Sequence, residues 1–76
     1  MSMEKELKKE IDYSKFKPFD RIVLAVKTMR GYVWTIGIFA FDDGDYVQLL
    51  TGFLRKKIII DMLPFEGNEH LVGKRV

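Results

Sequence analysis

The sequence predicts a mainly β protein: a small five-stranded barrel with a short N-terminal helix and one short helical turn near the C-terminus. Three observations predict this fold: apolar runs of strand length, tight-turn signals between them, and a length of 76 residues, which suits one domain. Of these residues 47% are hydrophobic, too many for a disordered chain. We expect residues 1–15 to form an N-terminal helical arm and residues 16–76 to form a single β-barrel domain.

The N-terminal helix is predicted over residues 2–11, where acidic and basic residues alternate on a helix-forming background. Ser2 is suited to cap its first turn, because a serine side chain accepts a hydrogen bond from the free N–H groups there. Met3, Leu7 and Ile11 recur every four residues and form one narrow apolar stripe. We expect this helix to lie across the barrel mouth or to fray.

The first two strands are predicted over residues 21–29 and 32–41, on either side of an Arg-Gly turn. The first contains five consecutive apolar residues, mostly β-branched, which is typical of a central strand buried on both faces. The second is apolar on both faces and contains Gly37. A glycine inside a long strand often marks a bend, and a bend lets a small sheet curl.

The remaining elements follow at short intervals. Asp-Asp-Gly-Asp at 42–45 predicts a tight hairpin turn, because Asp-Gly readily adopts the positive φ that such turns need. Strands are predicted over 46–50 and 53–60, with Pro64 as a strand end, a helical turn within 66–72 and a short fifth strand near 74–76. Closely spaced strands of this kind indicate a Src-homology-like or Sm-like barrel.

Composition excludes several classes of function. The chain has no cysteine, which removes disulfides, thiolate nucleophiles and cysteine-ligated metal centres. The longest apolar run, residues 36–41, is far shorter than the roughly 20 residues that a membrane-spanning helix needs. No secretory signal pattern is present at the start, so we expect no membrane association and a cytoplasmic location.

The sequence predicts no catalytic, cofactor-binding or metal-binding residue. Asp42, Asp43 and Asp45 lack the later bidentate glutamate of a calcium loop, so we expect a solvated hairpin tip. His70 is the only histidine, and no serine or threonine pattern resembles a nucleophile elbow. The glycines form neither a phosphate-binding loop nor a dinucleotide fingerprint. We therefore expect that the protein is not an enzyme.

A basic run at residues 55–57 is the most distinctive polar feature. In a strand, Arg55 and Lys57 would share one face, and together with Arg21 and Trp34 they would make a nucleic-acid-binding or anion-binding surface. Further basic residues that would extend such a patch are Lys27, Arg30, Lys74 and Arg75. Lysines on an edge strand also discourage aggregation without any ligand, and both interpretations remain open.

A small domain without disulfides favours association with another chain. The aromatic residues Tyr32 and Trp34 are the candidates for a protein interface. Our leading hypothesis is a non-enzymatic binding or assembly module that acts through a protein partner or through self-association. The alternative is a small nucleic-acid-binding barrel, and a third hypothesis is a barrel that holds a small anion with the same basic residues and His70.

The Lys-Pro-Phe-Asp segment at 17–20, the central Trp34 and the Pro-Phe-Glu-Gly-Asn-Glu-His-Leu-Val-Gly ending at 64–73 form a recurring pattern. In these features the chain resembles small uncharacterised proteins of phages, prophages and gut-type bacteria, over residues 16–73. The resemblance implies a small β-barrel with an accessory role and no enzyme activity. Within that pattern we expect Pro18 and Phe19 to start the first strand and plug one barrel end, and His70 and Leu71 to cover the other.

Overall fold

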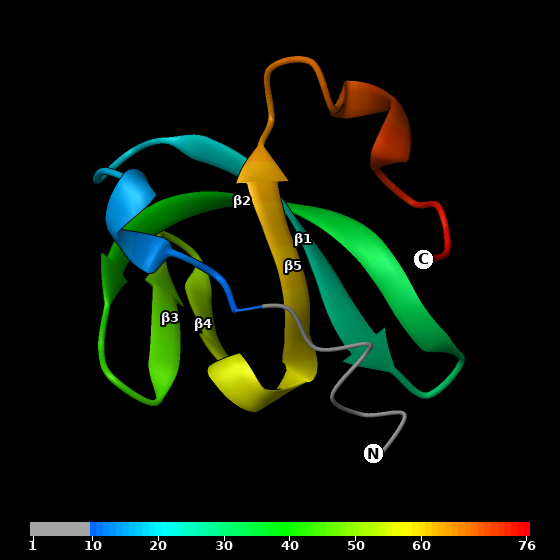
Figure 1. Cartoon of the computed structure of the whole chain (residues 1–76), viewed down its shortest axis with the longest axis horizontal. Coiled ribbons are helices and arrows are strands. Elements are labelled where there is room, and N and C mark those ends of the chain that lie inside the picture. Colours follow the sequence, from blue (N-terminus) through cyan, green and yellow to red (C-terminus); the bar gives the residue numbers. More distant parts are fainter. Residues whose placement is uncertain (1–9) are drawn as a thin grey trace.

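The computed structural model describes residues 10–76 and shows a five-stranded antiparallel sheet with three 3₁₀ turns (Figure 1). The elements are η1 (Tyr13–Lys15), β1 (Arg21–Thr28), β2 (Gly31–Asp42), β3 (Tyr46–Leu49), β4 (Gly52–Arg55), η2 (Lys56–Ile58), β5 (Ile59–Pro64) and η3 (Glu69–Leu71). The strand order is β4-β3-β2-β1-β5, so β1 to β4 form a meander and β5 returns beside β1. The prediction of a mainly β fold is confirmed.

Strand β1 is the centre of one half of the sheet, as its apolar run predicts. Residues 22–26 are all buried, because β1 pairs with β2 on one side and β5 on the other and both of its faces are covered. Ile22, Leu24 and Val26 belong to one core cluster, and Val23 and Ala25 belong to a second. A continuous run of apolar, mostly β-branched residues is what such a position requires.

Strand β2 joins the two halves of the sheet, and Gly37 lies at its centre. The strand pairs with β1 through residues 31–38 and with β3 through residues 39–42 (Figure 1). A Cβ atom at Gly37 would lie 3.2 Å from Leu24 Cδ1 and 3.3 Å from Leu49 Cδ1. The absent side chain therefore lets these two leucines from different strands meet over β2.

The predicted fourth strand over residues 53–60 is wrong as a single element. The structure divides it into β4, the 3₁₀ turn η2 and the start of β5. The Arg-Lys-Lys run that was expected within a strand therefore lies at the end of β4 and in η2. The isoleucines that follow it enter β5, where Ile59 and Ile60 are buried.

The closed barrel is also wrong. Among residues 10–76, β4 pairs only with β3 and β5 pairs only with β1, so the sheet stays open between β4 and β5. The reason lies in η2, which turns the chain from one edge of the sheet to the other without aligning the two edge strands (Figure 1). An open sheet leaves its inner apolar face to be covered by another segment.

Residues 10–16 supply that cover. Ile11, Tyr13 and Phe16 pack against the inner core cluster, and the Phe16 ring lies 6.0 Å from the Phe39 ring. The predicted helix over residues 2–11 falls almost entirely outside the described residues, and the described part begins with irregular chain followed by η1. The segment is held at its start by Asp12, whose side chain accepts a hydrogen bond from the Ser14 N–H at 3.1 Å.

The C-terminal segment covers the opposite face of the sheet. Phe65 and Leu71 pack on the second core cluster, which includes Trp34. The predicted helical turn is confirmed as η3, but the predicted fifth strand at 74–76 is wrong, because the tail forms a single bridge between Arg75 and Val33. Both core faces are thus completed by irregular segments, one from each end of the chain (Figure 1).

We expect Phe16→Ala to lower the free energy of unfolding by about 2 kcal/mol, because it removes half-buried aromatic surface from the open side of the core. Phe41→Ala is the matched control: its ring is exposed, and the substitution should cost less than about 1 kcal/mol. Urea denaturation followed by tryptophan fluorescence measures both. Equal losses would show that residues 10–16 do not seal the core.

Candidate functional site

The Lys-Pro-Phe-Asp segment forms a tight turn just before β1. The Asp20 N–H donates to the Lys17 carbonyl at 3.0 Å, and the Asp20 carboxylate accepts from the Lys17 N–H at 2.9 Å. Pro18 occupies the second position, and Phe19 in the third has a φ of 75°. A bond from residue i to i+3, proline second and positive φ third are the features of a type II turn, whose third position favours glycine.

The same residues form a β-bulge against β2. Phe19 N–H donates to the Phe39 carbonyl at 2.7 Å, and Phe39 N–H donates to the Asp20 carbonyl at 2.8 Å. Two residues therefore oppose one, and the first of the two is left-handed, a position that glycine normally fills. Phe19 thus occupies the one position, shared by the turn and the bulge, whose left-handed backbone favours glycine.

A second copy of this turn and bulge occurs near the C-terminus, and there the residue is glycine. The Lys74 N–H donates to the Leu71 carbonyl at 2.9 Å, and Gly73 has a φ of 84°. Gly73 N–H donates to the Trp34 carbonyl at 2.8 Å, and Trp34 N–H donates to the Lys74 carbonyl at 2.9 Å. The two sites have the same hydrogen-bond pattern, so Gly73 is an internal reference for Phe19.

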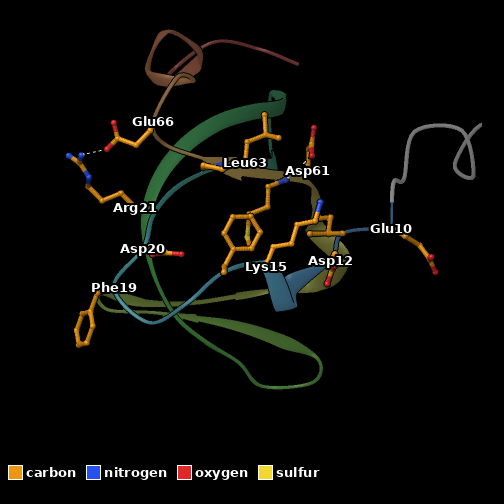
Figure 2. Close-up of a pocket in the computed structure, with 13 residues that line it drawn as sticks. Glu10, Asp12, Lys15, Phe19, Asp20, Arg21, Asp61, Leu63 and Glu66 are labelled. Atoms are coloured by element: carbon orange, nitrogen blue, oxygen red, sulfur yellow. Dashed lines mark hydrogen bonds and ion pairs between the residues drawn. The ribbon is translucent and has the colours of Figure 1, made fainter.

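The Phe19 side chain gains little from packing in return. It is 73% exposed, and Figure 2 shows its ring directed away from the other side chains drawn there. A left-handed conformation costs a residue with a Cβ about 1–2 kcal/mol. The expected plug role of Phe19 is therefore wrong, since Tyr13 and Phe16 fill the core and the neighbouring turn points Phe19 outward.

A groove of about 600 Å³ runs beside this turn, between residues 10–21 and β5 (Figure 2). Its charged lining is mainly acidic: Glu10, Asp12, Asp20, Asp61 and Glu66, with Lys15 and Arg21. Arg21 pairs with Glu66 at 2.5 Å, and its guanidinium lies 4.9 Å from the Phe65 ring centre. Hydrogen bonds from the Ser14 side chain and N–H lower the pKa of Asp12. Among residues 10–76 no cluster of three or more side chains is arranged to hold a metal ion.

The structure does not bring together the residues that were predicted as a nucleic-acid or anion site. Trp34 is 8% exposed and packs in the second core cluster, so its ring is not a free platform for a base or a partner, whereas Tyr32 is half-buried against the same cluster. Arg21 lies at the start of β1, whereas Arg55 ends β4, and two strands separate them in the sheet. Lys57 lies in η2, two residues after Arg55.

The basic run at 55–57 lies against the acidic hairpin tip. Lys56 pairs with Asp42 at 2.5 Å and lies 4.3 Å above the centre of the Tyr13 ring. The hydrogen bond from Lys56 lowers the pKa of Asp42, while burial and then the Asp42 charge raise the pKa of Tyr13. The acidic tip therefore offsets part of the positive charge that made this run a candidate site.

Sequence reasoning identified the Lys-Pro-Phe-Asp motif but not the role of Phe19. A glycine after Pro18 would have indicated the type II turn directly, and its absence concealed the turn.

Comparison with protein families, with curated proteins and with solved structures gives no match. Within residues 10–76 no helix has the length and apolar character to cross a bilayer.

We expect Phe19→Gly to leave the free energy of unfolding unchanged or to raise it by up to about 1 kcal/mol, because relief of the left-handed conformation outweighs the extra freedom of glycine in the unfolded chain. Gly73→Ala, at the matching site, should lower it by about 1 kcal/mol, since a Cβ there meets no atom within 4 Å and only the backbone conformation is penalised. Urea denaturation checks both, and a loss above about 2 kcal/mol for Phe19→Gly would make its ring a structural contact.

Proposed function

We propose that the protein is a non-enzymatic binding module that recognises a partner protein through the Phe19 turn. The observation that carries this proposal is that the exposed Phe19 ring occupies a backbone position that favours glycine. The matching position in the same chain, Gly73, has glycine. Residues held in unfavourable backbone conformations concentrate at functional sites. An aromatic ring serves recognition and supplies no acid, base or nucleophile.

The turn is well built to present a side chain. Its four residues are tied by two internal hydrogen bonds and by two more to Phe39, which itself is buried in the core. A ring on such a rigid support loses little conformational freedom on binding, and aromatic anchors of this kind dominate many protein interfaces. We infer that the partner offers an apolar pocket for this ring. The proposed accessory role in a phage or mobile element is based on the sequence resemblance.

The test is a photocrosslinking experiment. The aromatic crosslinker p-benzoylphenylalanine replaces Phe19, and the protein is irradiated in a cell extract of the organism that carries its gene. Met29, 105% exposed at the β1–β2 turn, is the matched control position. We expect discrete covalent adducts from position 19 only. Excess unmodified protein should prevent them, whereas excess Phe19→Gly protein should not.

Two outcomes would contradict the proposal. Equal adducts from positions 19 and 29 would indicate that the extract labels any exposed site. Equal competition by the native protein and by Phe19→Gly would show that the ring does not contribute to recognition, even if a partner is captured. Phe19→Gly is informative here because we expect it to remain folded.

Self-association is a second candidate function, and the two edges of the sheet differ in their suitability for it. On β5, Met62 and Pro64 direct their backbone groups away from β1, but proline has no N–H and the Met62 N–H donates to the Asp61 carboxylate at 2.9 Å. On β4, Phe53 and Arg55 direct their backbone N–H and carbonyl groups away from β3, toward the open edge of the sheet. The β4 edge is therefore the one where a second copy would pair, around a two-fold axis at Leu54.

We expect the native protein to form a dimer in solution and Phe53→Pro to be a monomer, because proline removes an outward N–H without breaking a bond to β3. Light scattering at several protein concentrations measures the mass of each. A monomeric native protein, or an unchanged dimer for Phe53→Pro, would rule out association through β4.

A further inference from the structure

Four basic residues that are far apart in the sequence meet at one end of the sheet. Lys27 and Arg30 belong to the β1–β2 hairpin, and Lys74 and Arg75 belong to the C-terminal tail. We call these four residues the basic end.

The tail joins the hairpin through backbone contacts along β2. Arg75 forms a bridge with Val33, and the Val76 N–H donates to the Tyr32 carbonyl at 3.0 Å. Lys27 is the cross-strand partner of Tyr32 on the other side of β2. Since neighbouring strands lie about 4.8 Å apart, the backbones of Lys27 and Arg75 are separated by only about two strand spacings.

The basic end lacks the ion pairs that Arg21 and Lys56 form elsewhere in the described residues. All four residues are exposed, and within the described part of the chain none of them forms an ion pair. By contrast, Arg21 pairs with Glu66, and Lys56 pairs with Asp42. The acidic residue of the C-terminal segment nearest in sequence is Glu69, in η3. The overall charge of +2 therefore conceals an uneven distribution, with a concentration of positive charge at this end.

We propose that the basic end binds the phosphate backbone of nucleic acid without sequence preference. Lys27 and Arg75 lie on paired backbone, with Arg30 in the adjoining hairpin turn and Lys74 next to Arg75 in the chain. Such a concentration of positive charge suits the closely spaced phosphates of a nucleic acid, whereas binding at a membrane surface commonly uses an amphipathic helix with a broad apolar face. Tyr32 is half-buried and Trp34 is buried, so the contacts are with phosphates and not with stacked bases. This site is separate from the Phe19 turn, and its proposal does not depend on a protein partner.

Binding of a fluorescent 20-base-pair duplex, measured by anisotropy between 50 and 150 mM NaCl, tests the proposal. Four phosphate contacts predict a slope of about −3.6 in log K against log salt, which is a loss of about fifty-fold in affinity over this range. Lys27→Gln with Arg30→Gln should halve that slope and weaken binding at least tenfold at 50 mM salt. Single-stranded DNA of the same length should bind with a similar dependence on these residues.

Arg55→Gln with Lys57→Gln is the matched control, because it removes the same charge from exposed residues at the other end of the sheet. It should change the affinity less than threefold, and Phe19→Gly should bind DNA like the native protein. Equal losses for the two double variants would show that only net charge matters and would overturn the proposal. No binding at 50 mM salt, or binding to phosphatidylserine vesicles in place of DNA, would also overturn it.

Discussion

The arrangement of residues 10–76 depends on one strand, β2, which pairs with β1 in one half of the sheet and with β3 in the other. Its first part pairs with β1 and its last part with β3, and Gly37 lies near the transition. Leu24 and Leu49 both approach this glycine so closely that a Cβ there would have to displace their side chains. The bend brings β4 round toward β5 without joining them, and the core is left open on one side. Ile11, Tyr13 and Phe16 close that opening by packing on the inner core cluster.

Closing the opening also determines where the candidate sites lie. Residues 10–16 must cross from the edge of β5 to the inner core, and the chain must then reverse sharply to enter β1. The Lys17–Asp20 turn makes that reversal and carries Phe19 outward. The C-terminal segment solves the matching problem on the other face, because after covering Trp34 it must rejoin β2, and doing so brings Lys74 and Arg75 beside the β1–β2 hairpin.

The parts of the fold that the sequence predicts well are those governed by local pattern. The buried run of β1, the Asp-Gly hairpin, the strand end at Pro64 and the helical turn η3 all depend on neighbouring residues. Closure of the barrel and the sealing role of Phe16 depend on contacts between distant segments, which periodicity does not report. Trp34 shows why a functional site is harder to predict than a strand. An aromatic residue in a strand is equally suited to a buried core and to an exposed interface, and only the packing of the C-terminal segment over Trp34 shows that it belongs to the core. The left-handed conformation of Phe19 was not predicted, because a sequence indicates such a position by glycine and phenylalanine gives no such signal.

The repeated turn and bulge connect these points. The chain uses one hydrogen-bonding pattern twice, at Phe19 and at Gly73, to lead an irregular segment back onto β2. At Gly73 the backbone requirement alone explains the residue, since the position is open and nothing contacts it. At position 19 the backbone is also left-handed, but the residue is phenylalanine, whose Cβ makes that conformation unfavourable. The ring is 73% exposed, so burial of the side chain does not offset the conformational cost. The backbone conformation alone would favour glycine at both sites, and the partner recognition that we propose would account for phenylalanine at one of them.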